Sequence, residues 1–376
     1  MKKKKVLFYI TTLDGGGAEK VLINLFRQIN LDKYEISVVT LFDHGKHVSL
    51  IPDKVRYKAI FHSDNVAIRK LETAFAYRIL PAKWFYKLFL HGDYDIEVGY
   101  LTGYPSKVIQ NSTSKTSKKI CFIHGSVEEE GFLEKFYDDL DNARILFSNL
   151  DKLCFISQAT MDGFIRKCGK LDNMLVLHNV VDVDEILAGA EQVIDTGFNK
   201  RNINIVSIGR LTQVKGYDRL LRVIKRLNEF KSEYTLSIIG EGDMKNELQE
   251  FIQNNGLTNV RLIPFTNNPF PYVKGADLFV CSSFSEGYST AVSEAALIGT
   301  PVITTDCDGM REIYHDVLGC RIVPNDEDSL YDELKIYLND PEYRKKLAAE
   351  AVVKAKTYQN EVRNNCTRYE ELFDEV

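Results

Sequence analysis

The stretch SSFSEGYSTAVSEAALIGTPVITT, residues 282–305, contains a change from strand to helix and back to strand. DLFVCSS, residues 277–283, leads into it as a short apolar run that predicts a buried strand. Residues 290–298 predict a helix, because a Gly-Thr-Pro turn at Gly299 caps and ends it. PVITT, residues 301–305, predicts the next strand. This succession is typical of parallel α/β sheets.

The same kind of apolar, β-branched run recurs along the whole chain, and helical segments separate several of the runs. Many of them lack polar alternation, as strands buried on both faces of a sheet do. The expected strands of the first half are residues 5–10, 34–41, 55–60, 95–100, 118–124, 152–157 and 174–179. Those of the second half are residues 203–209, 234–240, 260–265, 277–283, 301–305 and 320–324.

Twelve or thirteen strands are too many for one ordinary sheet. We therefore expect an α/β protein with two Rossmann-like, doubly wound parallel-sheet domains, residues 1–182 and residues 183–376. The sequence leaves open whether the last helix packs back on the first domain. In such sheets, ligands bind beyond the carboxyl ends of the strands. The cleft between two such domains is the expected site.

Composition places the chain among ordinary globular proteins. It has 376 residues, of which 44% are hydrophobic and 27% charged. No apolar stretch reaches the roughly 20 residues that span a bilayer, and the basic amino end lacks the pattern of a signal peptide. Seven scattered cysteines without a CxxC pattern suit a reducing cytoplasm. No cluster of metal-ligand type appears, so we expect no metal site.

The formal charge differs between the two halves. Residues 1–180 carry 26 basic and 21 acidic side chains, whereas residues 181–376 carry 22 and 32. Within residues 1–127 the balance is 20 basic to 11 acidic. Opposite charges suggest that the two domains meet different partners. No nucleic-acid-binding signature accompanies the basic half, so we expect no nucleic acid partner.

Two cations follow one expected strand of the second half. In RLTQVKG, Arg210 and Lys215 precede Gly216, which opens a helix. Cations on such a loop, together with the amides of a helix N-terminus, can hold an anion. A solvated surface loop is the alternative interpretation.

Residues at two strand ends of the first half are weaker candidates. Gly15, Gly16 and Gly17 follow the first strand, but they complete neither GxGxxG nor a P-loop, and a plain tight turn fits equally well. Their lack of side chains would allow backbone amides to approach a phosphate or a sugar. His124 ends the strand KKICFI, where a functional and a structural role are both open.

Glu286 and Glu294 raise the question of paired carboxylates. A retaining glycosidase needs carboxyl groups about 5 Å apart, whereas eight helical residues rise roughly 12 Å. The two side chains suit an elongated ligand better, with an anionic middle bound by amides near residues 288–290. A nucleotide-sugar has this shape. Taken singly, Glu294 could equally be an ordinary helix residue and Glu286 a surface charge.

The combined pattern resembles the retaining GT-B glycosyltransferases of family 4. Four segments carry the resemblance in the second half: SIGRLTQVKG (207–216), IGEG (239–242), PYVKGAD (271–277) and SSFSEGYSTAVSEAALIGTP (282–301). The two glutamates match the E-x7-E motif of that family. GGAEK after the first strand and HNVVD before the second domain match as well. CDGMREI departs from it, because a Gly-Gly pair is frequent where Asp308 and Gly309 stand.

The resemblance implies a role for each candidate residue. Glu294 would bind the nucleotide ribose, Glu286 the donor sugar, and Arg210 with Lys215 the diphosphate. His124 would lie near the transferred sugar. The remaining residues implied at the nucleotide-sugar are Gly16, Gly17, Gly209, Phe265, Gly287, Tyr288, Ser289 and Thr290. Phe265 is only loosely assigned to the nucleotide base.

The resemblance also implies the reaction. We expect a metal-independent, hexosyl-type glycosyltransferase that uses a nucleotide-sugar, with UDP as the expected carrier, and that requires no cofactor. Transfer to a hydroxyl of a cell-envelope, capsular or lipid-linked glycan would retain configuration. A non-catalytic nucleotide-sugar-binding or chaperone subunit is the alternative. A dinucleotide oxidoreductase is disfavoured because neither glycine loop completes GxGxxG.

Residues 68–92 bear on the acceptor. The segment carries five basic side chains and six aromatic ones, with Glu72 as its only acid. Such a mixture can seat a helix on an anionic membrane surface. A helical pair packed on the core is the alternative. With the basic balance of the first domain, the segment favours peripheral association with the inner face of the membrane and a lipid-linked acceptor.

Overall fold

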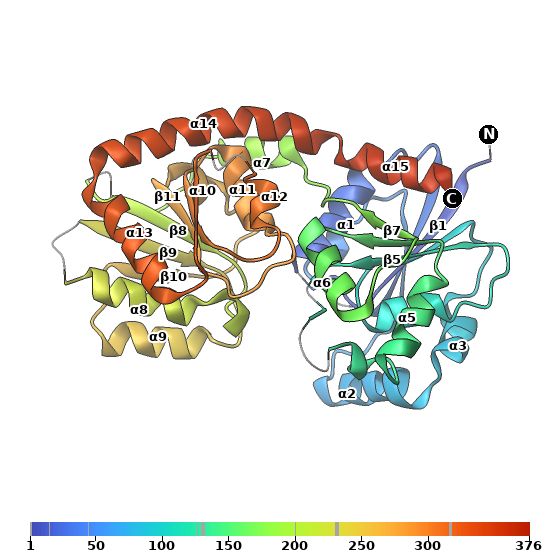
Figure 1. Ribbon diagram of the computed structural model, residues 1–376. Helices are drawn as coiled ribbons and strands as arrows, with labels where there is room; N and C mark the ends of the chain where they lie inside the picture. The colour runs from blue at the N-terminus through green and yellow to red at the C-terminus, as the bar shows by residue number, and fades with distance from the viewer. Residues whose placement is uncertain are drawn as a thin grey trace. The chain divides into compact units, whose positions relative to one another are not determined.

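A computed structural model gives the structure of the chain (Figure 1). It describes residues 2–14, 16–43, 45–125, 127–128, 132–199, 201–229, 233–315 and 318–376. The chain divides into two compact units. Unit 1 comprises Met1–Val181 and Asn364–Val376, and unit 2 comprises Asp182–Arg363. The division lies one residue from the expected boundary, and the last helix belongs to unit 1.

Unit 1 contains a seven-stranded sheet in the order β3-β2-β1-β4-β5-β6-β7, in which every neighbouring pair is parallel. Its strands are β1 (Lys4–Ile10), β2 (Tyr34–Phe42), β3 (Arg56–Phe61), β4 (Ile96–Gly99), β5 (Lys118–Ile123), β6 (Lys152–Phe155) and β7 (Met174–Val176). The central strand β1 pairs Phe8 with Val38 on one side and with Val98 on the other. All three residues are fully buried, as the apolar runs predicted.

Helices cover both faces of this sheet (Figure 1). The α-helices are α1 (Gly17–Gln28), α2 (Val66–Ala74), α3 (Ala82–Phe85), α4 (Tyr104–Gln110), α5 (Leu140–Ser148), α6 (Gln158–Cys168) and α15 (Asn365–Glu375). The shorter helices are η1 (Val48–Leu50), η2 (Phe75–Ile79), η3 (Tyr86–Leu90) and η4 (Leu133–Lys135). One core joins the sheet to α1 and α15 through residues such as Leu25 and Phe373. The other joins it to α3, α4 and α5 through residues such as Phe85 and Phe147.

Unit 2 contains a six-stranded parallel sheet in the order β10-β9-β8-β11-β12-β13. Its strands are β8 (Ile203–Ile208), β9 (Tyr234–Ile239), β10 (Val260–Ile263), β11 (Leu278–Cys281), β12 (Val302–Thr305) and β13 (Cys320–Val323). With the seven strands of unit 1, all the expected strands are confirmed. In both sheets the order reverses beside the first strand of the unit, the position at which ligands bind in open α/β sheets.

The helices of unit 2 are α7 (Val183–Ala190), η5 (Gln213–Lys215), α8 (Tyr217–Leu227), α9 (Lys245–Asn254), α10 (Phe270–Gly275), α11 (Thr290–Ile298), α12 (Met310–Ile313), α13 (Glu327–Asn339) and α14 (Pro341–Arg363). Helices α8, α9 and α13 bury their apolar sides against one face of the sheet. Helix α11 has the predicted bounds and ends at Gly299, whose φ is +88°. Long helix α14 is bonded to α11, since Gln359 donates to the Leu297 carbonyl at 2.8 Å.

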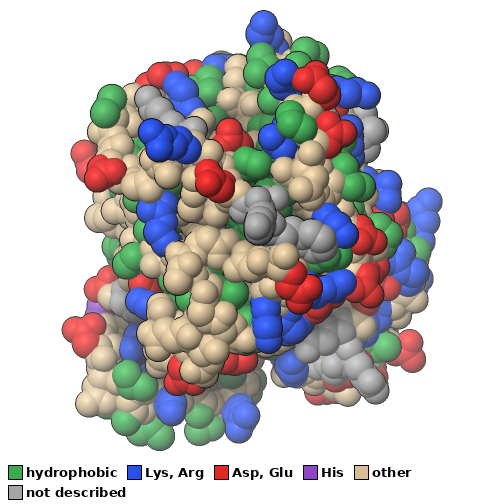
Figure 2. All heavy atoms as spheres, turned by 90° about the vertical axis from the view of Figure 1, so that its left-hand side faces the viewer, with side chains coloured by type: hydrophobic (Ala, Val, Ile, Leu, Met, Phe, Trp, Pro, Cys, Tyr) green, Lys and Arg blue, Asp and Glu red, His purple; other side chains and the backbone are tan. Residues whose placement is uncertain are grey.

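Charges and thiols are distributed differently in the molecule. Figure 2 shows one face, on which basic and acidic side chains are intermingled. Ion pairs such as Arg222–Glu327 at 2.8 Å and Arg226–Asp328 at 2.7 Å have the same mixed character in unit 2. The seven cysteines, by contrast, are all buried and free.

Candidate functional site

Two loops at the carboxyl ends of β8 and β11 are bonded to each other in unit 2. The Phe284 amide donates to the Val214 carbonyl at 2.8 Å, and the Ser282 hydroxyl donates to the Lys215 carbonyl at 3.0 Å. Gly216 allows this close approach, because it has a φ of +62° and a Cβ there would lie 2.2 Å from the Ser282 carbonyl oxygen. The loops therefore form one rigid surface at the sheet edge where ligands bind.

Lys215 and Glu286 meet on this surface. The Lys215 Nζ donates to Glu286 Oε1 at 2.6 Å, and the Ser283 hydroxyl donates to the same oxygen at 2.6 Å. The side chains of Lys215 and Glu286 are only 23% and 10% exposed. Burial by itself would lower the pKa of Lys215, but the Glu286 carboxylate outweighs it, and the pKa is raised. The lysine is therefore a cation held in place by a carboxylate.

Arg210 supplies a second cation beside this pair. It follows Gly209 at the end of β8 and is exposed. Its charge opposes the protonation of Lys215, so the two cations act on each other. In the part of the chain that the structure describes, the guanidinium has no hydrogen-bond or ion-pair partner. An anion that reaches this loop would meet one free and one paired cation.

The second glutamate lies on helix α11. Glu294 is buried, with 7% of its surface exposed. Ser289, the N-cap of the helix, makes no capping bond with its side chain, which leaves the first-turn amides to other partners. Gly287 and Thr290 are half-buried beside it. Tyr288 points elsewhere, because its hydroxyl bonds Tyr358 of α14 at 2.7 Å, so its backbone is the part that could contact a ligand.

The predicted residues of unit 2 therefore divide into three places. Arg210, Lys215 and Glu286 lie on the bonded loops, and Glu294 lies in α11. Phe265 is exposed after β10, two strands away from β8 in the sheet. It belongs to the same edge of the sheet but not to the bonded loops.

His124 ends β5 in unit 1. Its amide donates to the Thr102 hydroxyl at 3.4 Å, and its ring lies 4.6 Å from that of Tyr100. Both ring nitrogens are shielded from solvent without a hydrogen-bond partner among the described residues. Burial lowers the pKa of His124 to about 3, so the imidazole is neutral at physiological pH. His124 is therefore an uncharged, shielded ring at the end of β5.

The glycine loop before α1 is bonded to a carboxylate. Gly16 is the N-cap of α1, and its amide donates to the Glu19 carboxylate. The Thr12 hydroxyl donates to the same carboxylate at 3.2 Å. The helix N-terminus therefore already holds an anion, and a phosphate there would be repelled by Glu19. That Gly16 and the exposed Gly17 lie near the donor phosphates stays a prediction.

One expected position of unit 1, Gly15, lies outside the described residues. Sequence reasoning missed two other residues. Ser283 lies within the quoted motif but had no assigned role, and Glu19 is the fourth residue of GGAE, the spacing of a capping box. The capping-box spacing could have revealed Glu19 before the structure was known.

The segment of residues 68–92 contributes partly to the core and partly to the surface. Phe85 and Tyr86 are fully buried, and Tyr77 and Phe89 pack against the core. Part of the segment therefore packs on the core, as the alternative interpretation held, and part of it is exposed. The large apolar side chains exposed between residues 66 and 90 are mainly aliphatic: Val66, Ile68, Leu71, Phe75, Ile79, Trp84 and Leu88. We call these seven residues the apolar face of unit 1.

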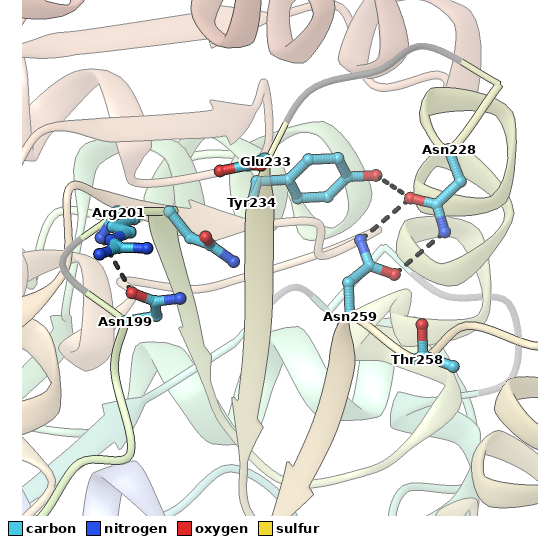
Figure 3. Close-up of a pocket in the computed structure, with 8 residues that line it drawn as sticks. Asn199, Arg201, Asn228, Glu233, Tyr234, Thr258 and Asn259 are labelled. Atoms are coloured by element: carbon cyan, nitrogen blue, oxygen red, sulfur yellow. Dashed lines mark hydrogen bonds between the residues drawn. The ribbon is translucent and has the colours of Figure 1, made fainter.

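A polar pocket of about 560 Å³ lies elsewhere in unit 2 (Figure 3). It is lined by residues that precede or begin β8, β9 and β10, so it lies at the amino ends of these strands. Its polar groups bond one another: Tyr234 donates to Asn228 at 2.5 Å, and Asn228 pairs with Asn259 at 3.0 Å. The pocket is thus at the edge opposite the bonded loops.

Two features are absent from the residues that the structure describes. Within them, no group of three or more His, Cys, Asp or Glu side chains is arranged to hold a metal ion. No helix among them combines the length and the apolar character needed to cross a bilayer.

Comparison with known proteins gives a family match. Residues 164–353, half of the chain, match the family described as glycosyl transferases group 1. The matched range contains both bonded loops and helix α11.

Two relatives from Campylobacter jejuni match nearly the whole chain. One is an N-acetylgalactosamine-N,N'-diacetylbacillosaminyl-diphospho-undecaprenol 4-alpha-N-acetylgalactosaminyltransferase, 26% identical over 94% of this chain and 96% of the relative. The other is a GalNAc-alpha-(1->4)-GalNAc-alpha-(1->3)-diNAcBac-PP-undecaprenol alpha-1,4-N-acetyl-D-galactosaminyltransferase, 24% identical over 94% of each chain.

Solved structures resemble the whole chain in fold. Anabaena Alr3699/HepE, solved with UDP and glucose, has a TM-score of 0.77 at 18% identity and covers 99% of this chain and 100% of its own. WaaG, a glycosyltransferase involved in lipopolysaccharide biosynthesis, has a TM-score of 0.74 at 15% identity over 98% and 99%. The two parallel-sheet α/β units together form the GT-B fold.

Proposed function

Since the chain belongs to the glycosyl transferases group 1, we propose that it transfers a hexosyl group from a UDP-sugar to a hydroxyl of a lipid-linked glycan, with retention of configuration. The contact that carries the proposal is the pairing of Lys215 and Glu286 at 2.6 Å beside the free cation of Arg210. A nucleotide-sugar contains a diphosphate and a sugar. The cation of such a pair can bind the diphosphate, and the carboxylate can bind the sugar. The family match replaces the hypothesis of a dinucleotide oxidoreductase.

Lys215 would change partner when the donor binds. The ammonium group of Lys215 would form an ion pair with the diphosphate in place of Glu286. The Glu286 carboxylate would then accept hydrogen bonds from the donor sugar. Arg210 and the first-turn amides of α11 would hold the remaining phosphate oxygens. Glu294 would bind the ribose hydroxyls. No metal ion is needed for these contacts, so the proposed reaction is metal-independent.

The chemical step exchanges one bond at the anomeric carbon. The bond from this carbon to the diphosphate oxygen breaks, and its electron pair leaves with the diphosphate. The acceptor oxygen bonds the same face of the sugar, and its proton passes to the leaving phosphate oxygen. Lys215 and Arg210 stabilise the charge that develops on the diphosphate, and such electrostatic stabilisation supplies much of the rate enhancement in many enzymes. His124, whose ring is neutral, would lie near the transferred sugar.

The alternative is a non-catalytic nucleotide-sugar-binding subunit. Mass spectrometry of the purified protein with a panel of nucleotide-sugars and undecaprenyl-diphosphate-linked glycans distinguishes the two. Transfer, or slow donor hydrolysis that Lys215→Ala abolishes, supports the enzyme. Binding of UDP without either reaction across the panel would favour the subunit.

The lipid-linked acceptor is proposed from the two relatives and from the surface of unit 1. Both relatives are named for undecaprenol-linked acceptors. The apolar face of unit 1 includes Leu71 and Ile79, which are 71% and 69% exposed. Lys70, Arg78, Lys83 and Lys87 are exposed along the same segment. Exposed apolar side chains among cations fit the surface of an anionic membrane.

We therefore propose that this face docks on the membrane from which the acceptor is taken. Each cation near an anionic surface contributes about 1 kcal/mol, which gives reversible binding. Burial raises the pKa of several of the free cysteines, as for Cys121 to about 12, and such unpaired thiols suit the reducing, cytoplasmic side.

Liposome co-sedimentation tests the docking. We expect wild type to bind anionic vesicles in low salt and Leu71→Ser/Trp84→Ser to lose this binding. The control Val193→Ser/Ile336→Ser removes two exposed apolar side chains from unit 2. Equal binding by all three proteins, or binding without preference for anionic lipid, would contradict the proposal.

A further inference from the structure

A buried arginine lies behind the bonded loops. Arg219, on α8, is 2% exposed. Its Nη1 donates to Asn325 Oδ1 at 2.9 Å, and its Nη2 donates to the carbonyls of Ser282 and, at 3.1 Å, Ser283. Its guanidinium carbon lies 4.1 Å from the centre of the Phe284 ring. Both terminal nitrogens and one face of the guanidinium are therefore used.

The charge of Arg219 has no carboxylate partner. Among the described residues, none places a carboxylate oxygen within ion-pair distance of its guanidinium, and its Nε has no hydrogen-bond acceptor. Burial lowers the pKa of Arg219. A buried charge without a counter-charge costs stability, so an apolar side chain would serve the packing of α8 better. The position of Arg219 calls for an explanation other than stability.

What Arg219 holds is the backbone before Glu286. The Ser282 and Ser283 carbonyls accept from Arg219, and the Phe284 carbonyl accepts from Asn325 Nδ2 at 2.8 Å. Asn325 is itself bonded to Arg219. This backbone carries Ser283 and leads to Glu286, and the Ser283 hydroxyl donates to the Glu286 carboxylate. Three successive carbonyls are thus fixed by one planar group and its amide partner.

We propose that Arg219 is a positioning residue, which fixes residues 282–284 so that Glu286 stands between Ser283 and Lys215. Only arginine offers a planar fork that can meet two carbonyls and an amide while stacking on a ring. Lysine would keep the charge but could not make these bonds together. The proposal rests on the proposed function, because it concerns the placement of the residue that meets the donor sugar.

Arg219→Met, Arg219→Lys and Asn325→Ala test the proposal. The control is Arg222→Met, one turn along α8, which removes an exposed arginine that pairs with Asp218 and Glu327. Calorimetry with UDP measures binding, and steady-state transfer from the UDP-sugar gives kcat and KM. A misplacement of about 1 Å in a catalytic group can cost about 100-fold in rate.

We expect Arg219→Met and Arg219→Lys to lower kcat by about 100-fold and Asn325→Ala by about 10-fold. The Kd of UDP should stay within about threefold in all of them, because Arg210, Lys215 and Glu294 are kept. The control should match wild type. Asn325 is exposed, so its variant folds even where Arg219→Met does not.

Three results would overturn the inference. One is wild-type kcat in folded Arg219→Met, or in Asn325→Ala if Arg219→Met does not fold. Another is full activity in Arg219→Lys, which would show that charge alone suffices. The third is a parallel loss of UDP binding, kcat and thermal stability, which would indicate general structural support. Wild-type protein without transfer would instead refute the proposed function itself.

Discussion

The loops after β8 and β11 in unit 2 carry two cations, whereas the loops after β1 and β5 in unit 1 carry a carboxylate and an uncharged imidazole. In unit 2, Arg210 and Lys215 face solvent or a single carboxylate, and anions can reach them. In unit 1, the helix end beside β1 is capped by Glu19, and the ring of His124 is uncharged. Two sheets of the same kind therefore present different side chains at these corresponding strand ends.

This difference teaches how one fold can serve two ligands. In the proposed function, the diphosphate meets the cations after β8 and the first-turn amides of α11 in unit 2. The transferred sugar, which offers hydroxyls, would lie near the uncharged His124 of unit 1. The topology decides where a ligand lies, and the side chains after each strand decide which ligand it is.

The largest expected effect comes from the cations of unit 2. Lys215→Ala and Arg210→Ala should each lower kcat by roughly 100- to 1,000-fold, because each removes a donor to the charge that develops in the transition state. Rates of transfer at saturating donor measure this. Lys245→Ala, an exposed lysine after β9, is the control and should be fully active. Near-normal turnover by both folded variants would contradict the proposal that these two cations stabilise the leaving diphosphate.

A smaller effect should separate the two glutamates. Glu294→Gln should weaken the binding of UDP by about 10- to 100-fold, because a hydrogen bond to a charged group contributes about 1.5–3 kcal/mol. Glu286→Gln should leave UDP binding nearly intact and lower turnover. Calorimetry with UDP and steady-state kinetics measure the two effects, and Glu247→Gln on α9 is the control. The opposite assignment of binding and turnover would reverse the proposed orientation of the donor.

The uncharged state of His124 can be tested by the pH dependence of stability. The pKa of His124 is about 3 in the folded protein and about 6.5 when unfolded, so the unfolded state binds more protons between these values. Stability should therefore fall as the pH falls, by about 2 kcal/mol from this histidine between pH 7.5 and pH 5. Urea unfolding at both pH values measures it.

In His124→Gln this contribution should vanish, and the difference in stability between the two pH values should shrink accordingly. The control, His91→Gln, replaces an exposed histidine of the same unit. An unchanged pH dependence in His124→Gln would mean that the ring is charged or well solvated in the folded protein.

The smallest expected effect is that of a chelator. Lys215, Arg210 and the amides of α11 are expected to hold the diphosphate, so transfer should continue in excess EDTA. Initial rates with and without EDTA, after dialysis, measure this. Loss of activity that Mg²⁺ or Mn²⁺ restores would mean that the cations of unit 2 do not hold the diphosphate by themselves.

Most of the strands could be predicted because they are apolar on both sides, and no tertiary information is needed to recognise such a run. The bounds of α11 followed in the same way from its glycine cap. The residues Lys215 and Glu286 could be named individually, but their direct contact could not. It depends on the bond between Phe284 and Val214, which joins loops 70 residues apart in the chain.

The segment of residues 66–90 shows a second limit. Leu80 donates to the Phe75 carbonyl and His91 to the Tyr86 carbonyl, which are bonds between residues five apart. Such wide turns rotate the helix face by about one residue, roughly 100°. A helical pattern of constant period therefore does not predict which side chains are exposed along this segment, in which Phe85 is buried and Leu88 exposed.

The burial of all seven cysteines has a practical consequence for experiments. Thiol reagents should leave the native protein untouched, so a cysteine introduced at an exposed position such as Val193 would be labelled alone. A fluorophore attached there would report on the protein without removal of any native thiol. The rate at which the native thiols react would measure unfolding, because each thiol reacts only when the core around it opens.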